Sequence, residues 1–407
     1  MRKVLVTCLM VGAFQGQVEA AEVQVNIRSS ETQANAAVAA GSAGGAVIVW
    51  RSYYTSPGRS NDILARRLDA HGAFVAEEFV VNEQTEGNQT EPAVAVDPRD
   101  RFAVVWQGPG PDQEDIFLRL FGPNGEATTG DLLVNLATAG RQLYPSVATG
   151  GGGTLAVAWE SREPGPAGEK SVVRVQLFDP NGAGLGGEIA VDTEPYDCRY
   201  PEVAMDAAGR FVVAWMRDRT IHPIVVRLFD TYGVPLTDPL VVNTANVASV
   251  TRPSIAMNWR GFFVVAWDGD PTRASNDDIY ARLYDLRGAP RGEPFLVNTI
   301  RAGAQRWPQV ALNAVNEFVI VWEHDTGDPK AATEIAGRYF DSGGVPAGEQ
   351  FQLNANTPDR QRYPDVAITG VGSFLAVWES DGQDGSGYGI FAGLEPSPLP
   401  VDPNQLN

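Results

Sequence analysis

The sequence predicts an all-β fold: a ring of seven blades, each a four-stranded antiparallel sheet, that fills residues 21–394. A hydrophobic phrase that ends in Trp recurs throughout the chain, and each repeat holds four extended phrases separated by turn residues. The phrase before the Trp is apolar on both of its alternating faces, so other sheets must cover both. The repeated tryptophans lie 52 to 56 residues apart, at Trp50, Trp106, Trp159, Trp215, Trp267, Trp322 and Trp378.

The first two phrases of each repeat predict its first two strands. The first phrase is Pro-x-Val-Ala, as at residues 92–95, 201–204 and 364–367. The second is Phe-Val-Val-Ala-Trp, clearest at residues 211–215 and 263–267. Because the second strand is apolar on both sides, we expect it to lie in the middle of a packed stack of sheets.

The third and fourth phrases complete the predicted blade. The third, Asp-Ile-x-x-Arg-Leu-Phe at residues 115–121, runs into a turn whose Gly can take a positive φ as the chain reverses. The fourth is a short strand that ends in Val-Asn, as at residues 81–82 and 297–298. The turn glycines are Gly72, Gly125, Gly182, Gly233, Gly288 and Gly344.

The last repeat lacks its fourth phrase, because the chain after residue 394 is a Pro-rich tail, residues 395–407. The missing phrase occurs at the other end, where residues 22–26 end in Val-Asn. Asn26 precedes Ala36 by ten residues, the same interval that separates Asn82 from Pro92. We therefore expect the N-terminal strand to complete the last blade and close the ring, which removes an exposed sheet edge.

These repeats resemble those of seven-bladed β-propellers, in particular the repeats of exported bacterial proteins of unassigned function. Residues 378–390, Trp-Glu-Ser-Asp-Gly-Gln-Asp-Gly-Ser-Gly-Tyr-Gly-Ile, carry the likeness most closely. The resemblance covers nearly all of residues 21–394 and implies a fold. It implies no single activity, because propellers host binding proteins, hydrolases, lyases and oxidoreductases alike.

The N-terminus predicts export. Residues 1–20 read as a signal peptide: Arg2 and Lys3 precede an apolar run, and Ala20 precedes the cleavage point. The run is too short to span a bilayer, and no later apolar stretch is long enough. We expect a periplasmic or extracellular protein in which Cys198 is the only remaining thiol, so that the packed core holds the fold together without disulfides.

The net negative charge limits the classes of partner that the protein can bind. The chain has 50 acidic and 31 basic residues and a net charge of −19. Nucleic acid and anionic lipid need a basic surface, so both are excluded as electrostatic partners. A neutral polymer, a cationic ligand or a divalent cation remains. We expect a monomeric propeller or a subunit of a larger assembly.

One face of the ring is expected to carry the recognition loops. Connections from the second to the third strand and from each blade to the next share this face. The former vary in length from 8 to 13 residues after the Trp, whereas the turns of the opposite face are short and uniform. Variable loops on a rigid scaffold indicate ligand recognition.

Acidic residues gather in these loops, and the third residue after the Trp is Asp in four consecutive repeats, beginning with Asp218. Asp-rich and Gly-rich loops supply the oxygen ligands that calcium prefers. The alternative is that these carboxylates cap the amides of their own turns. The candidate calcium ligands are Asp268, Asp270, Asp325, Asp328, Asp381 and Asp384.

An Arg followed by an aromatic residue comes just before the Pro of several repeats, and Arg252 is a partial match. Aromatic rings near the mouth of a propeller could stack on sugars while guanidinium groups bind hydroxyls or carboxylates. The alternative is that the rings pack between blades and the arginines pair with blade carboxylates. The candidate ligand-binding residues are Tyr144, Arg199, Tyr200, Arg306, Trp307, Arg362 and Tyr363.

No motif for catalysis is present. His71, His222 and His324 lie in different repeats, and no Cys/His metal spacing or nucleotide-binding loop occurs. A glycosidase with paired carboxylates stays open, and His324 is the best single acid–base candidate. We expect a non-enzymatic propeller that binds a carbohydrate or a protein. The alternatives are a polysaccharide hydrolase or lyase, and a structural module of a surface or periplasmic complex.

Overall fold

The computed structural model describes residues 22–54, 60–165, 168–218, 222–243, 252–270, 277–327, 333–355, 358–369 and 373–396. The predicted signal peptide, most of the predicted tail and the candidate ligand Asp328 lie outside these residues. No helix in the described ranges is long and apolar enough to cross a membrane.

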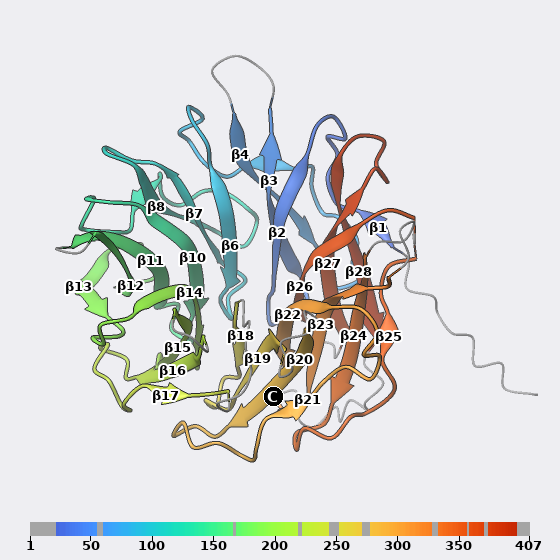
Figure 1. The fold of residues 1–407 in the computed structure, drawn as a ribbon. Helices are drawn as coiled ribbons and strands as arrows, with labels where there is room; N and C mark the ends of the chain where they lie inside the picture. The colour runs from blue at the N-terminus through green and yellow to red at the C-terminus, as the bar shows by residue number, and fades with distance from the viewer. Residues whose placement is uncertain are drawn as a thin grey trace, which may run out of the picture.

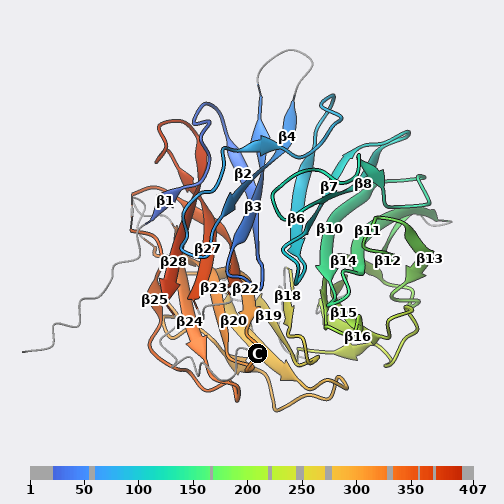
Figure 2. The same cartoon turned by 180° about the vertical axis from the view of Figure 1, so that it is seen from behind.

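Seven antiparallel sheets of four strands surround a central axis, which confirms the predicted fold class (Figure 1). The same ring is seen from behind in Figure 2. The innermost strands are β2 (Gln33–Ala40), β6 (Thr90–Val96), β10 (Gln142–Thr149), β14 (Asp197–Met205), β18 (Ser254–Met257), β22 (Gln305–Leu312) and β26 (Gln361–Ile368).

The second and third strands of the blades carry most of the core. The second strands are β3 (Ala46–Tyr53), β7 (Phe102–Pro109), β11 (Leu155–Gly165), β15 (Phe211–Asp218), β19 (Phe263–Gly269), β23 (Phe318–Asp325) and β27 (Ser373–Asp381). The third strands are β4 (Asn61–Leu68), β8 (Glu114–Phe121), β12 (Gly168–Phe178), β16 (Ile224–Phe229), β20 (Asp278–Tyr284), β24 (Thr333–Phe340) and β28 (Tyr388–Pro396).

The outermost strands are short, which leaves little exposed edge for pairing with other chains. Six of the described outer strands have two residues, and β13 has seven. They are β1 (Val23–Gln24), β5 (Phe79–Val80), β9 (Leu132–Leu133), β13 (Gly184–Ala190), β17 (Leu240–Val241), β21 (Phe295–Leu296) and β25 (Phe351–Gln352).

The core lies between blades. Each of the seven buried clusters in the described residues joins two neighbouring blades, and the repeated tryptophans are at most 1% exposed. Several indoles donate a hydrogen bond to a buried Gln that lies 17 residues earlier, such as Trp322 Nε1 to Gln305 Oε1 at 2.8 Å. This Gln provides the hydrogen-bond acceptor that the buried indole N–H requires. The same pairs are Gln33–Trp50, Gln89–Trp106 and Gln142–Trp159.

The fourth blade replaces this Gln with the unpaired Cys198. The indole of Trp215 donates instead to Asp192 Oδ2 at 3.1 Å, and Arg217 Nε donates to the same oxygen at 2.6 Å. Cys198 is 2% exposed, and burial together with Asp192 raises the pKa of its thiol. The thiol is therefore a packing group rather than a reactive one.

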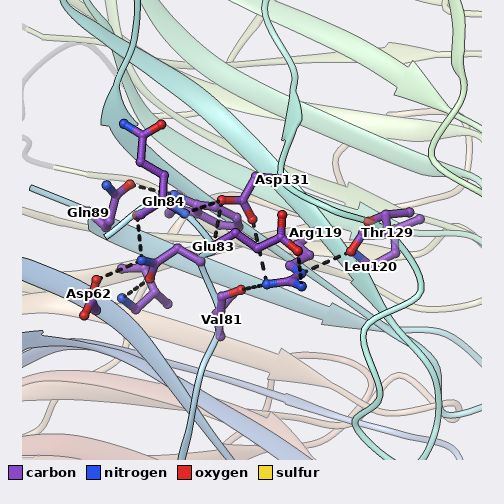
Figure 3. Close-up of polar contacts among 12 residues, drawn as sticks. Asp62, Val81, Glu83, Gln84, Gln89, Arg119, Leu120, Thr129 and Asp131 are labelled. Carbon is purple, nitrogen blue, oxygen red and sulfur yellow. Dashed lines mark hydrogen bonds and ion pairs between the residues drawn. The ribbon is translucent and has the colours of Figure 1, made fainter. Parts of the chain in front are cut away.

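The outer strands are tied across blades by the Arg of the third phrase. Arg119 Nη1 on β8 donates to the carbonyl of Val81, in the preceding blade, at 2.7 Å, and its Nη2 donates to Glu83 at 2.7 Å (Figure 3). Asn82 donates to Asp62 Oδ1 at 2.8 Å, and its own Oδ1 accepts the amide of Ile63. The Asn that ends the fourth phrase is thus a polar clamp in every blade but the third, where Asp192 takes its place.

The N-terminal strand closes the ring as predicted. Val23 and Gln24 of β1 pair with Ala392 and Phe391 of β28. The clamp is repeated there, because the amide of Ile390 donates to Asn26 Oδ1 at 2.8 Å. β28 runs to Pro396 and so includes the first two residues of the predicted tail.

Replacing Asn26 by Ala tests the closure. Asn26→Ala leaves the buried amide of Ile390 without its acceptor, and we expect the free energy of unfolding to fall by about 1–3 kcal/mol. Chemical denaturation at equilibrium measures this loss. Asn135→Ala is the matched control, because it removes the same clamp within one blade, from the amide of Ile116. No loss in Asn26→Ala beside a normal loss in Asn135→Ala would contradict closure by β1.

Candidate functional site

The innermost strands of all seven blades surround a central channel with a cavity of about 590 Å³. Each blade contributes the residue that directly precedes the Pro of its inner strand. In the first blade Ala36 stands in place of the Pro. These positions lie where the inner strands begin, at the face that carries the blade-to-blade connections. We call them the mouth ring: Asn35, Glu91, Tyr144, Tyr200, Arg252, Trp307 and Tyr363.

The mouth ring is built on a strained backbone. The pairing of the first and second strands shifts register at this point in six blades, as between Leu143 and Ser146 of β10. Six ring residues have φ between 48° and 55°, a left-handed conformation that is costly for Tyr and Trp. Strain of this kind persists only where neighbouring groups enforce it, and it concentrates at functional sites.

The preceding blade enforces this conformation. In four blades the residue that follows the buried Trp accepts a hydrogen bond from the ring residue of the next blade. The amide of Asn35 donates to Glu379 Oε1 at 2.6 Å, and that of Tyr144 donates to Gln107 Oε1 at 3.1 Å. Trp307 and Tyr363 are held in the same way, the first by Asp268 Oδ2 at 3.3 Å and the second by Glu323.

The aromatic side chains of the ring gather around one guanidinium group. The rings of Tyr144 and Tyr200 meet edge to face with centroids 5.0 Å apart. The guanidinium carbon of Arg252 lies 4.6 Å from each of these two centroids and 5.4 Å from that of Trp307. Trp307 in turn meets Tyr363 edge to face at 5.2 Å. The result is a nearly continuous aromatic arc with a cation beside it.

The charges around the arc are paired. Arg252 Nη1 lies 3.7 Å from Glu91 Oε2, and Asn35 Nδ2 donates to the other oxygen of Glu91 at 3.3 Å. Arg362 Nε donates to Glu379 Oε2 at 2.8 Å, and its guanidinium carbon lies 3.5 Å from the centroid of Tyr388. The mouth therefore offers donors and acceptors without a strong net charge.

Two carboxylates lie deeper in the channel, two residues further along the strands of Tyr200 and Tyr363. We call Glu202 and Asp365 the floor pair. Burial and the charge of Asp365 raise the pKa of Glu202 to about 7, partly offset by a hydrogen bond from Ser146. Burial raises the pKa of Asp365 to about 6. Both groups therefore change protonation near neutral pH.

The structure places some of the predicted ligand-binding residues in the channel and others outside it. Tyr144, Tyr200, Trp307, Arg362 and Tyr363 line the channel. Arg199 and Arg306 instead form ion pairs, Arg199 with Asp218 of its own blade at 3.2 Å and Arg306 with Asp277 of the preceding blade at 3.0 Å.

The predicted calcium ligands do not converge in the described part of the chain, where no group of three or more His, Cys, Asp or Glu side chains could hold a metal ion. Asp268 holds the amide of Trp307, and Asp325 Oδ1 accepts the amide of Gly327 at 2.9 Å. Asp384 Oδ2 accepts from Asn26 at 2.9 Å. Asp270 is 2% exposed, and Asp381 pairs with Tyr388 in the blade-seven sheet.

His324 lies outside the channel lining, with its Nδ1 2.8 Å from Gln305 Nε2 and its pKa lowered by burial. Several channel residues were not identified from the sequence. The shared position before the Pro, where Arg252 was a partial match, would also have identified Glu91, and the position after it would have identified Glu202 and Asp365.

No protein-family model matches the chain, and no curated protein matches it. Solved structures of similar fold include a protein of unknown function from Dyadobacter fermentans, at 11% identity and a TM-score of 0.55, over 92% of this chain and 97% of that one. An ulvan lyase bound to a glucuronate–rhamnose 3-sulfate saccharide matches at 10% identity and a TM-score of 0.57, over 92% and 96%. A fungal alcohol oxidase in complex with copper matches at 11% and 0.54, over 92% and 76%. At these identities the likeness shows the fold alone.

The raised pKa of Glu323 predicts that the stability of the fold depends on pH. Burial raises the pKa of Glu323 to about 7 from 4.5, although the amide of Tyr363 and nearby arginines oppose the shift. A carboxyl with a raised folded-state pKa stabilises the fold most below its unfolded pKa and loses this contribution as the pH rises through the folded value. Glu323→Gln stays neutral and keeps an acceptor for Tyr363. We expect its melting temperature to exceed that of the wild type by more at about pH 8 than at about pH 5. An equal difference at both would contradict the assignment.

Calcium binding stays a prediction from the sequence. If the loops bind calcium in the folded state, the melting temperature rises with calcium concentration because binding stabilises the native state alone. Thermal unfolding in calcium and in a chelator measures this, with magnesium as the control cation. Identical melting temperatures would rule out a stabilising calcium site.

Proposed function

We propose that this protein binds a carbohydrate at the mouth ring. One observation carries the proposal: a strained bulge, repeated around the axis, presents four aromatic side chains and Glu91 to the channel, where Arg252 joins them. Aromatic faces stack on the apolar faces of sugar rings, while guanidinium and carboxylate groups bind hydroxyls. The aromatic side chains are Tyr144, Tyr200, Trp307 and Tyr363.

The size and charge of the channel support a saccharide. Its volume of about 590 Å³ lies within the range usual for small-ligand sites. The ion pairs of Arg252 with Glu91 and of Arg362 with Glu379 leave polar groups without a dominant charge, which suits a neutral polyhydroxyl ligand. The ring is also partly open to solvent, since Tyr363 is 37% exposed.

The enzymatic alternative is favoured over the non-enzymatic binder that the sequence suggested. The floor pair adds titratable carboxylates that sugar binding alone does not require. The ulvan lyase, whose structure holds a saccharide, provides an example of a similar fold in a polysaccharide-degrading enzyme. Carbohydrate binding at the mouth ring is common to both readings, so it is tested first.

Alanine substitutions test the mouth ring. In a panel of plant, algal and bacterial polysaccharides, we expect Tyr200→Ala, Trp307→Ala and Tyr363→Ala each to weaken retention by about ten-fold or more, because each removes a stacking surface. Affinity electrophoresis in gels that contain each polysaccharide measures the effect, with melting curves to confirm folding.

Tyr232→Ala is the matched control. Tyr232 is 85% exposed and lies in a turn of the opposite face, so its loss removes an exposed ring without touching the channel. Retention that is unchanged in the ring variants, or equally reduced by Tyr232→Ala, would refute the mouth ring as the site. Lack of retention on every polysaccharide, together with self-association, would favour the structural-module alternative.

A further inference from the structure

The floor pair lies one step deeper than the proposed sugar site. Glu202 and Asp365 follow the ring residues Tyr200 and Tyr363 by two positions, a distance of roughly 7 Å along an extended strand. They come from the fourth and the seventh blade and line the same channel. A sugar stacked on the ring would therefore extend towards both carboxylates.

We propose that the floor pair hydrolyses a glycosidic bond of the saccharide held by the mouth ring, with Glu202 as general acid and Asp365 as general base. This assignment rests on the proposed carbohydrate binding and adds a reaction to it. The substrate class is a neutral glycan whose terminal sugar enters the channel.

The surroundings of the two carboxylates assign their roles. Asp365 accepts two backbone amides, from Val38 at 2.7 Å and from Val366 at 2.8 Å, which favour its charged form. Glu202 accepts one hydroxyl, from Ser146 at 3.1 Å. Burial and the charge of Asp365 raise the pKa of Glu202 above that of Asp365, to about 7 against about 6. A pair whose environments separate the two pKa values in this way provides an acid and a base near neutral pH.

The chemical step uses water as the second reactant. The carboxyl proton of Glu202 moves to the glycosidic oxygen as the bond from the anomeric carbon to that oxygen breaks, and the bonding electron pair stays on the oxygen. The water oxygen bonds to the anomeric carbon while Asp365 takes a water proton. The products are two sugars with free hydroxyl groups. The proton then returns from Asp365 to Glu202 through solvent, which restores both groups.

The fold itself does not require carboxylates at these positions. The equivalent residue is Ala37 in the first blade and Ala93 in the second. In the fifth blade Ser254 holds the amide of Val310 at 3.1 Å and donates to Gln309 at 2.9 Å. This repeats, with a neutral amide acceptor, the arrangement in which Ser146 serves Val203 and Glu202.

The inference therefore rests on a departure from the repeat. A carboxylate inside the molecule carries a desolvation cost that Gln or Ala avoids. Asp365 holds the amide of Val38 in the next blade, a task that the neutral Ser146 and Ser254 perform at the same position. Gln309 likewise takes the place of Glu202 as a neutral acceptor. Blade packing therefore needs an acceptor at these positions but no charge, and a function in the channel explains the charge.

The first test separates an acid from a merely structural group. The probes are the polysaccharides that bind, together with p-nitrophenyl glycosides of glucose, galactose, mannose, xylose and arabinose in both anomeric forms. p-Nitrophenolate leaves without a proton, so general acid catalysis matters little for it. We expect Glu202→Gln to slow polysaccharide hydrolysis by about 100-fold or more but to spare p-nitrophenyl glycosides. Asp365→Asn should slow both.

The second test uses matched serines. The charged groups that act on Glu202 are Asp365 and Arg252, and the hydroxyl of Ser146 favours its ionised form. Ser146→Ala removes that bond, raises the pKa of Glu202 and should move the alkaline limb of the pH–rate profile to higher pH. Ser254→Ala removes the same bond from neutral Gln309 and should leave the limb in place. Both variants lose the same two inter-blade hydrogen bonds, one accepted and one donated by the serine, so their melting temperatures should match.

The outcomes distinguish this inference from the proposed function. Binding without products from any probe overturns the hydrolytic floor pair and leaves the carbohydrate site standing. Products that absorb as unsaturated uronates identify a lyase and overturn the hydrolysis. Equal losses of Glu202→Gln on both kinds of probe, or equal shifts in the two serine variants, also overturn it. Absence of binding to every polysaccharide overturns the proposed function itself.

Discussion

The structure depends on one constraint: the second strand of every blade is apolar on both faces and must be covered on both. An open stack of sheets leaves the outer faces of its two end sheets uncovered, whereas a closed ring covers both faces of every sheet. The seven inter-blade clusters, each joining two neighbouring blades in the described residues, are the result. The hydrogen bond of Asn26 and the arginine bonds across the outer strands add polar contacts to this packing, which the apolar strands already determine.

Blade number and closure could be predicted because they follow from local chemistry that repeats. The Trp phrase marks each second strand, and Val25-Asn26 reproduces the fourth phrase so closely that its pairing with β28 could be inferred across the whole chain. The glutamines that serve the indoles were missed. Gln305 and its equivalents are polar residues at the start of a strand, and an apolar pattern does not distinguish a buried Gln there from an exposed one.

The candidate site was predicted only in part, for reasons of strand geometry. Arg199 and Arg306 were grouped with the aromatic residues that follow them. Consecutive residues on a strand point to opposite sides, and these two arginines pair with Asp218 and Asp277 instead. The positions of the floor pair can be read from the repeat, since each directly follows a Pro, but their shared cavity could not be predicted from one sequence, because Glu202 and Asp365 are 163 residues apart and line the same channel only in the closed ring. A calcium site stays a sequence prediction, although Asp268 and Asp325 each accept a nearby backbone amide.

The bulge before each Pro separates what holds the ring together from what faces the channel. Its backbone follows the register shift and, in several blades, an acceptor from the neighbouring blade, as Gln107 shows for Tyr144. The side chain at that position takes no part in setting it, and Asn, Glu, Tyr and Trp all occupy the same conformation. Substitutions at these positions can therefore change the lining of the channel one blade at a time with little effect on the stability of the core. A repeat gene of this kind can diversify its ligands while its architecture stays constant.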